Sequence, residues 1–277
     1  MAGKEKKKKN RSGRVLLTII LIVCIGVAAY AAYNLISIGL EYKVGEDEYA
    51  ALQEYTHKVP EDAEDSDEAQ EADEDESQPV KKKVKPPITV DFDKLIEINS
   101  DFVGWFYMEA EDISYPLVHY EDNDFYLHRT FEKTDNFAGT LFVEALNNPD
   151  FKDPNTIIYG HNMRNLSMFG KLKLLVQNED YKKSDIFWIL TPEGSYKYRM
   201  INIETVNVSS DVYTLFSFPS QDVVEYIKAR NAESSVPFEL GEIGENSKVV
   251  TLSTCVGAGG SERLVVQGLL VGGDIEN

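Results

Sequence analysis

Cys255 and Arg263 are the two residues of this sequence whose types and spacing suggest catalysis. They lie at the ends of two apolar, β-branched runs within VVTLSTCVGAGGSERLVVQGLLV, residues 249–271, and a glycine-rich loop separates the runs. This pattern predicts two strands joined by a pliable connection. If the strands pair, a thiol lies beside a guanidinium, which stays charged and carries five donors. We interpret the pair as a nucleophile with an oxyanion partner; the alternative is a buried structural cysteine beside a surface ion pair.

The N-terminus combines a basic segment with an apolar one. Residues 1–14 contain seven Lys or Arg and a single Glu, and residues 15–40 contain no charge. The apolar run exceeds the roughly 20 residues that cross a bilayer, and basic flanks stay cytoplasmic. The sequence therefore predicts a single-pass signal anchor in the cell membrane, with a cytoplasmic N-terminus and an extracellular remainder. Cleavage of a signal peptide near Ala31 is the alternative, because Ala29 and Ala31 have the spacing of a cleavage site.

This topology leaves Cys255 as an unpaired thiol. The other cysteine, Cys24, lies within the predicted membrane segment, so no intrachain partner is expected on the outer side. Exported proteins tend to pair their cysteines or to lack them, and a single leftover thiol indicates reactivity or intermolecular pairing. The cysteine content thus favours the catalytic interpretation.

Residues 41–87 are predicted to be a disordered stalk, because 11 of the 16 residues from 61 to 76 are Asp or Glu. Residues 88–277 are long enough for one domain with its own core. This domain contains 15 basic and 30 acidic residues, a net charge of −15, which argues against nucleic acid as a partner. It has no zinc-type cysteine cluster, P-loop or dinucleotide fingerprint, so neither a metal nor a cofactor is predicted.

The domain is predicted to be mainly β. Apolar spacing indicates a helix within residues 91–106, and a second helix is predicted at residues 221–230 after Ser220, a plausible N-cap, with Val224, Ile227 and Lys228 on one side. Short β-branched runs predict strands at residues 114–118, 140–143, 156–159, 186–190, 196–208, 248–253 and 264–271. Many short strands with few helices favour a closed or nearly closed β-barrel.

A thiol nucleophile needs a base, and four histidines are present. His57 lies in the predicted stalk. His119 and His161 each follow a predicted strand, so periodicity does not rank one above the other, and His128 has no such signal.

Three motifs in order resemble the signature of the sortases, specifically class B: YGHNM at residues 159–163, TLSTC at residues 251–255, and an arginine eight residues later. Supporting similarity runs through DFVGWF, ISYPLV, DNDFYL and MFGKL between residues 101 and 172, and the predicted helix at 221–230 matches a class B insertion before the next-to-last strand.

The resemblance implies a sortase β-barrel and a cysteine transpeptidase that attaches surface proteins to the cell wall. Cys255 matches the nucleophile, His161 the general acid/base, and Arg263 the cation that stabilises the oxyanion or positions the substrate. Asn123, Leu127 and Ser253 match positions that contact the sorting signal. The implied partners are surface proteins with a C-terminal sorting signal and a peptidoglycan precursor amine.

One departure from the family pattern concerns the residues after the nucleophile. Some class B enzymes have an acidic residue there, whereas this chain has Val256 and Gly257. Two alternatives stay open, an exported thiol peptidase of another fold and a non-catalytic surface module with an inert thiol. The first is disfavoured because no papain-like local motif occurs.

Overall fold

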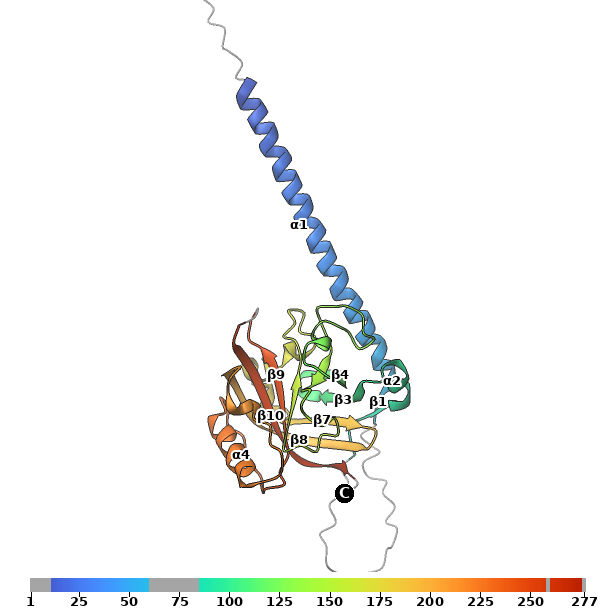
Figure 1. The fold of residues 1–277 in the computed structure, drawn as a ribbon, viewed down its shortest axis with the longest axis vertical. Coiled ribbons are helices and arrows are strands. Elements are labelled where there is room, and N and C mark those ends of the chain that lie inside the picture. Colours follow the sequence, from blue (N-terminus) through green and yellow to red (C-terminus); the bar gives the residue numbers. More distant parts are fainter. Residues whose placement is uncertain (1–10, 60–84, 258–259, 276–277) are drawn as a thin grey trace, which may run out of the picture. The chain divides into compact units, whose positions relative to one another are not determined.

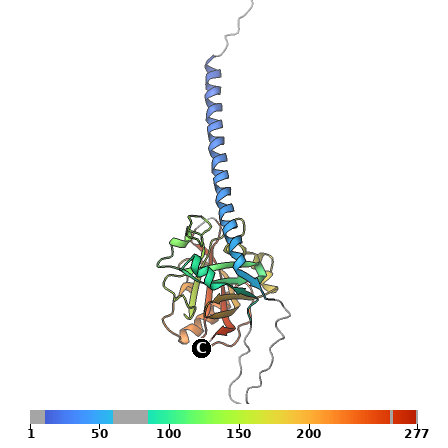
Figure 2. The ribbon, with the colours of Figure 1, turned by 90° about the vertical axis from the view of Figure 1, so that its right-hand side faces the viewer.

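The computed structural model describes residues 11–59, 85–257 and 260–275. The chain divides into two compact units, Met1–Val44 and Gly45–Asn277. The first unit contains most of helix α1 (Arg11–Leu52), which Figures 1 and 2 show as one uninterrupted helix. An 18-residue window of this helix has a mean hydropathy of 2.7, and the apolar side chains of residues 15–40 are exposed. By length and composition, α1 is able to cross a membrane.

Strands of the second unit close into a barrel. Within the described residues its order is β10-β8-β7-β3-β4-β5-β6-β9, and pairing of β9 with β10 completes the ring. The strands are β3 (Phe102–Met108), β4 (Ile113–His119), β5 (Leu141–Val143), β6 (Asn155–Tyr159), β7 (Ile186–Thr191), β8 (Gly194–Asn207), β9 (Val249–Cys255) and β10 (Glu262–Ile275). The predicted closed barrel is confirmed, and the seven predicted strands correspond in order to β4 through β10.

Two strand pairs in the barrel are parallel, β4 with β5 and β6 with β9. Parallel strands end at the same edge of a sheet, whereas antiparallel neighbours end at opposite edges. The chain therefore leaves β6 and β9 at one rim of the barrel. This arrangement brings together residues that are nearly 100 positions apart in the sequence.

Aromatic side chains fill much of the barrel interior. Phe106 of β3 packs edge-on against Phe169 at 5.6 Å between ring centroids, and its ring is tilted against that of Phe187 of β7 at 5.5 Å. Phe187 in turn stacks on Tyr198 at 5.3 Å. Rings of this size bury large apolar areas and dominate the stabilisation of a core.

Helix α4 (Gln221–Glu233) confirms the predicted inserted helix, and it lies outside the barrel beside β8 and β10 (Figure 1). Its buried face carries Val224 and Ile227 but not Lys228, which is exposed. Ser220 occupies the N-cap position without a side-chain hydrogen bond. The helix thus forms where apolar spacing indicated it, and its buried face also includes Val223, Tyr226 and Arg230.

The predicted helix within residues 91–106 is wrong in its second half. Helix α2 ends at Ile98 (Phe92–Ile98), and β3 begins at Phe102. β3 is buried along nearly its whole length, so it has no alternation of polar and apolar residues to mark it as a strand. A short helix α3 (Leu174–Gln177) was not predicted either.

Within the predicted disordered stalk, residues 41–87, the structure describes residues 41–59 and 85–87, and the segment up to residue 58 is folded. The end of α1 continues into a 3-10 turn, η1 (Gln53–Tyr55), and a strand, β1 (Thr56–Lys58), which pairs with β2 (Ile88–Val90). Tyr49 and Leu52 are buried, with 6% and 2% of their surfaces exposed. The segment from Gly45 to residue 58 is thus a folded part of the second unit. The acidic residues 61–76 lie outside the described residues.

Candidate active site

Cys255 and Arg263 face each other across the β9–β10 pair. They are direct Cα partners in the antiparallel register, as the hairpin interpretation predicted. Cys255 is half-buried, and the Arg263 guanidinium is held at the loop between the strands, where Nη1 donates to the carbonyls of Gly260 at 2.7 Å and Glu262 at 2.9 Å. A thiol accessible from solvent therefore lies next to a fixed cation.

His161 lies on the other side of Cys255. In the parallel register of β6 and β9, Tyr159 is the partner of Ser253, so two further residues along each chain bring His161 level with Cys255. Two hydrogen bonds continue this pairing beyond the strands: Gly160 N donates to Ser253 O at 3.1 Å, and Asn162 Nδ2 donates to Cys255 O at 2.9 Å. The barrel thus brings the backbones of Cys255, Arg263 and the segment that follows β6, which includes His161, to one rim.

Gly160 makes this approach possible. A β-carbon at this position would lie 2.3 Å from Cδ2 of Leu141 and 2.7 Å from Cδ2 of Phe169, far inside van der Waals contact. The backbone before His161 therefore packs directly onto the core. A side chain at position 160 would push the histidine segment away from β9.

The main-chain carbonyl of Leu127 fixes the His161 ring. Nε2 of His161 lies 2.8 Å from Leu127 O. A carbonyl only accepts, so Nε2 carries the proton in the neutral ring and Nδ1 has the free lone pair. Burial lowers the pKa of His161 below its usual value, and the hydrogen bond to Leu127 opposes part of that shift. Leu127, predicted to contact the substrate, therefore contacts the predicted base through its backbone.

Ser253 lies on the same face of β9 as Cys255, because alternate residues of a strand share a face. Its Oγ lies 2.8 Å from the hydroxyl of Tyr213, which belongs to the 3-10 turn η7 (Asp211–Tyr213) in the connection from β8 to β9. Arg263 and Cys255 both act electrostatically on Tyr213. Sequence reasoning did not select Tyr213, because it lies in a connection without a recognisable motif.

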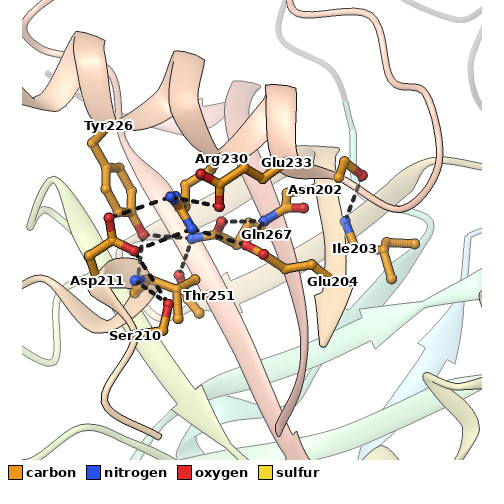
Figure 3. A network of polar contacts seen from close by, with 12 residues as sticks. Asn202, Ile203, Glu204, Ser210, Asp211, Tyr226, Arg230, Glu233, Thr251 and Gln267 are labelled. Carbon is orange, nitrogen blue, oxygen red and sulfur yellow. Dashed lines mark hydrogen bonds and ion pairs between the residues drawn. The ribbon is translucent and has the colours of Figure 1, made fainter. Parts of the chain in front are cut away.

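A buried arginine holds that connection in place. Arg230 of α4 is 3% exposed, and its guanidinium contacts Glu204 and Asp211 at 3.3 Å and Glu233 at 3.0 Å. Figure 3 shows this group between α4 and the barrel. Asp211 is the first residue of η7, so the ion pair with Arg230 anchors the turn that carries Tyr213.

Asn123 belongs to a hydrogen-bonded group centred on Glu144. The Glu144 carboxylate, 8% exposed as a residue, accepts from Asn123 Nδ2 at 2.7 Å and from the Tyr159 hydroxyl at 2.8 Å. Asn123 Oδ1 accepts from Ala145 N at 2.8 Å. The Tyr159 ring stacks on Tyr213 with centroids 6.5 Å apart. Asn123 is thus connected to the Ser253 side of the site through two tyrosines, and sequence reasoning missed both Glu144 and Tyr159 as members.

A pocket of about 450 Å³ adjoins Cys255. Its lining includes Cys255, Asn162, Lys173, Gln177 and Glu204, and none of the three predicted sorting-signal residues. Lys173 Nζ donates to Asn162 Oδ1 at 3.2 Å.

Two of the other histidines, His57 and His119, lie on other strands, whereas the charge of His128 adds to burial in lowering the pKa of His161. His119 ends β4, which is separated from β6 by β5, and the exposed His128 lies 3.9 Å from Asp124. His57, in β1, is the register partner of Thr89. In the described part of the chain, no three His, Cys, Asp or Glu side chains gather as a metal site would require.

Comparison with known proteins agrees with this geometry. Residues 107–271 match the family model of the sortase domain. The chain is 32% identical over 185 residues to sortase B of Listeria monocytogenes, covering 64% of this chain and 72% of that protein.

Solved structures lead to the same conclusion. Sortase B of Clostridium perfringens superposes with a TM-score of 0.60 at 29% identity, covering 65% of this chain and 98% of that one. Sortase B of Bacillus anthracis, in complex with AAEK1, has a TM-score of 0.66 at 25% identity, covering 85% and 100%. The chain therefore belongs to the sortase family, is a class B sortase within it, and is accordingly a cysteine transpeptidase.

Proposed function

We propose that Cys255 is the nucleophile, His161 the general acid/base and Arg263 the oxyanion partner of a reaction that joins surface proteins to the cell wall. Two observations support this proposal: Arg263 is the register partner of Cys255, and the parallel pairing of β6 with β9 ends two residues before His161 and two before Cys255. Three separate chain segments converge on one half-buried thiol.

In the first half-reaction, the Cys255 thiolate attacks the carbonyl carbon of the threonine in a sorting motif. The resulting oxyanion receives charge-assisted hydrogen bonds from Arg263. The tetrahedral intermediate then collapses: the peptide bond breaks, its nitrogen takes a proton from His161 and leaves as an amine, and a thioester remains on Cys255.

The neutral tautomer of His161 assigns its two nitrogens different tasks. Nε2–H donates to Leu127 O and holds the ring, so Nδ1 exchanges protons with the thiol and with the amines. A carbonyl thus orients the ring in a chain that has no acidic residue directly after the nucleophile. Because the pKa of His161 is lowered, the imidazole is mainly neutral at pH 7, and the protonated ring is the minor form.

In the second half-reaction, an acceptor amine attacks the thioester, gives its proton to His161 and releases the thiolate. This step reverses the first with a different amine, so the acceptor arrives where the leaving amine departed. We place the acceptor in the pocket beside Cys255. The ammonium of Lys173 in its wall suits a carboxylate near the acceptor amine, as in the stem peptide of peptidoglycan.

The sorting signal is assigned to the opposite side of the site, near Asn123, Leu127 and Ser253. The groups that orient these residues support this assignment, because Glu144 holds the Asn123 amide and Tyr213 contacts Ser253. Proline in the motif fixes one backbone angle of the substrate, which limits the grooves that accept it.

The domain arrangement is proposed as a cytoplasmic tail at residues 1–14, a membrane anchor at residues 15–40 with the N-terminus inside, and an extracellular catalytic domain. The apolar exposed surface of α1 and the basic residues before it support this orientation. The catalytic domain includes the folded segment from Gly45 to residue 58, in addition to residues 88–277.

A mass-spectrometric search for the thioacyl adduct tests the catalytic roles. The protein is incubated with LPxTG-like and NPxTN-like peptides, and Cys255→Ala and His161→Ala are each expected to abolish the adduct. His57→Ala is the control, because this histidine is exposed and belongs to the β1–β2 pair, away from His161. Substantial turnover by Cys255→Ala would contradict the assignment of Cys255 as the nucleophile.

A second measurement separates the enzyme from an inert surface module. Labelling of Cys255 with a thiol reagent is followed across pH, in a Cys24→Ala background, with and without His161→Ala. An enzyme requires a labelling profile that depends on His161. An unchanged profile favours the inert module.

A further inference from the structure

Tyr49 lies at the end of the helix that contains the membrane anchor, yet its hydroxyl reaches the surroundings of His161. The Tyr49 hydroxyl donates to Gly139 O at 2.5 Å and lies 3.0 Å from the Thr140 hydroxyl. All three groups are in the second unit. The Tyr49 ring packs edge-on against Tyr115 at 5.4 Å between centroids. The side chain is 6% exposed, so these contacts replace water at a buried polar group.

Gly139 lies so close to the His161 ring that no side chain fits between them. A β-carbon at Gly139 would lie 3.1 Å from Cδ2 of His161, 2.6 Å from Tyr126 O and 2.9 Å from Leu127 O. The φ angle of Gly139 is +60°, a left-handed conformation that other residues rarely adopt. The Gly139 backbone therefore packs beside both the imidazole and the carbonyl that holds its Nε2.

Thr140 ties the same backbone to the loop that ends in Leu127. Thr140 N donates to Tyr126 O at 3.0 Å, and Thr140 Oγ1 donates to Arg129 O at 2.9 Å. The Tyr49 hydroxyl binds on the other side of this segment. Residues 139 and 140 are thus clamped between the end of α1 and the loop that orients His161.

We propose that Tyr49 is a positioning residue for the transpeptidation reaction, which acts on His161 through Gly139 and the Leu127 carbonyl. This inference rests on the proposed role of His161. Without the Tyr49 hydroxyl, the Gly139 backbone is free to move away from the His161 ring. Water then reaches the imidazole, and the hydrogen bond from Nε2 to Leu127 O loosens. The segment just outside the membrane is then part of the catalytic apparatus.

Three other residues hold the same segment against the barrel. Glu46 accepts from Asn165 Nδ2 at 2.7 Å, and Glu48 accepts from Glu132 N at 2.9 Å. Gln53 Nε2 donates to Ser114 O at 2.8 Å, and Gln53 Oε1 accepts from Ser114 Oγ at 3.0 Å. Gln53 anchors the segment at β4 without contacting Gly139 or Thr140, and it provides a matched control.

The test compares Tyr49→Phe with Gln53→Ala in the full chain in detergent. Phenylalanine keeps the ring and its packing against Tyr115, so only the hydroxyl is lost. Tyr49→Phe is expected to slow thioacyl formation about three- to tenfold, the size expected for one lost hydrogen bond. It is also expected to raise the pH at which His161 titrates by NMR, because desolvation is the largest cause of the lowered pKa, and its relief by added water outweighs the loosened hydrogen bond to Leu127. Thr140→Val should change both measurements in the same direction.

Gln53→Ala is expected to lower the melting temperature without changing the rate or the titration of His161. A wild-type rate and titration in Tyr49→Phe would overturn the inference, and so would equal changes in Gln53→Ala, which would indicate general loosening. If the wild-type protein forms no thioacyl adduct with any peptide, the proposed function fails instead. The His161 titration still tests the Tyr49 contact in that case.

Discussion

Arg263 is the direct register partner of Cys255 across the β9–β10 pair. The two residues are held by a continuous ladder in which Leu264 pairs with Thr254 and Val265 with Ser253, so their spacing does not depend on the loop between them. The ladder fixes the backbone of Arg263, and the carbonyls of Gly260 and Glu262 hold its guanidinium. Such fixed groups lower the barrier more than groups that must reorganise.

Replacement of Arg263 by lysine is expected to lower the rate of thioacyl formation by about 10² to 10³, the usual effect of losing one oxyanion donor. Lysine keeps the charge but lacks the planar fork of donors. Single-turnover mass spectrometry measures the rate. Arg199→Lys is the control, because Arg199 is partly exposed and pairs with Asp185 at 3.7 Å, away from the site. Retention of most of the rate by Arg263→Lys would contradict a geometric role for the guanidinium.

A peptide panel tests the substrate side of the site. Pentapeptides with Asn or Ser in the first position are expected to react faster than one with Leu, because Asn123 offers both a donor and an acceptor. Asn123→Ala should narrow this difference, and Glu144→Ala should do the same because its carboxylate orients the Asn123 amide. The effects of the two substitutions on this difference should not be additive, since both remove the same hydrogen bond between Asn123 and Glu144. Preference for Leu in the first position would refute this assignment but not the transpeptidase activity.

The acceptor pocket predicts a separation between the two half-reactions. Lys173→Met is expected to leave thioacyl formation unchanged and to shift the thioester toward hydrolysis when the acceptor is diaminopimelate. With the amidated acceptor, the variant and the wild type should behave alike. Lys171→Met is the control, because Lys171 contacts Asp112 instead of the pocket. The measurement is the ratio of transpeptidated to hydrolysed product, determined by chromatography. Equal ratios in wild type and Lys173→Met would contradict the proposal that Lys173 binds a carboxylate of the acceptor.

Glu111 predicts a pH dependence of stability outside the active site. Burial, with Asp180 nearby, raises the pKa of Glu111 to about 7 from 4.5. The folded state therefore keeps a proton that the unfolded state releases, and the free energy of unfolding falls as pH rises from 4.5 through 7. Glu111→Gln should be about 1 kcal/mol more stable than wild type at pH 8, after allowance for solvent screening, and little different at pH 4.

Denaturant unfolding at the two pH values measures this difference. Glu109→Gln is the matched control, since Glu109 is in the same 3-10 turn, Glu109–Glu111, but exposed. An equal effect of the two substitutions at pH 8 would show that net charge, not the buried carboxyl, is responsible.

Protease treatment of intact protoplasts tests topology and the folded segment together. A glutamate-specific protease that cuts within residues 60–84 should leave the catalytic domain attached to the cells, because Tyr49, Leu52 and the β1–β2 pair bind the anchor fragment to it. Tyr49→Ala combined with Leu52→Ala should release the domain after the same cut. A tag before Val15 should be protected throughout. Loss of the tag would reverse the orientation, and release without protease would indicate cleavage near Ala31.

The sequence by itself determined the elements whose residues carry a local signal. β-Branched runs bounded by turn residues marked β4 through β10, and β9 and β10 framed a loop with Cys255 and Arg263 at its ends. The register of such a hairpin follows from local geometry, so the pairing of these two residues was predictable. β3 was not predicted, because burial of nearly every residue removes the alternation of polar and apolar residues that identifies a strand.

The residues by themselves did not rank His119 against His161 as the partner of Cys255, because both follow strands. Only the tertiary structure distinguishes them. The parallel pairing of β6 with β9 settles it, and strands far apart in sequence leave no local trace of such pairing. The same holds for Tyr49. Its surroundings in the sequence are polar and acidic, and its role depends on a contact with Gly139, 90 residues away. A hydrogen bond of this kind depends on how distant segments pack, and packing is a property of the folded chain alone.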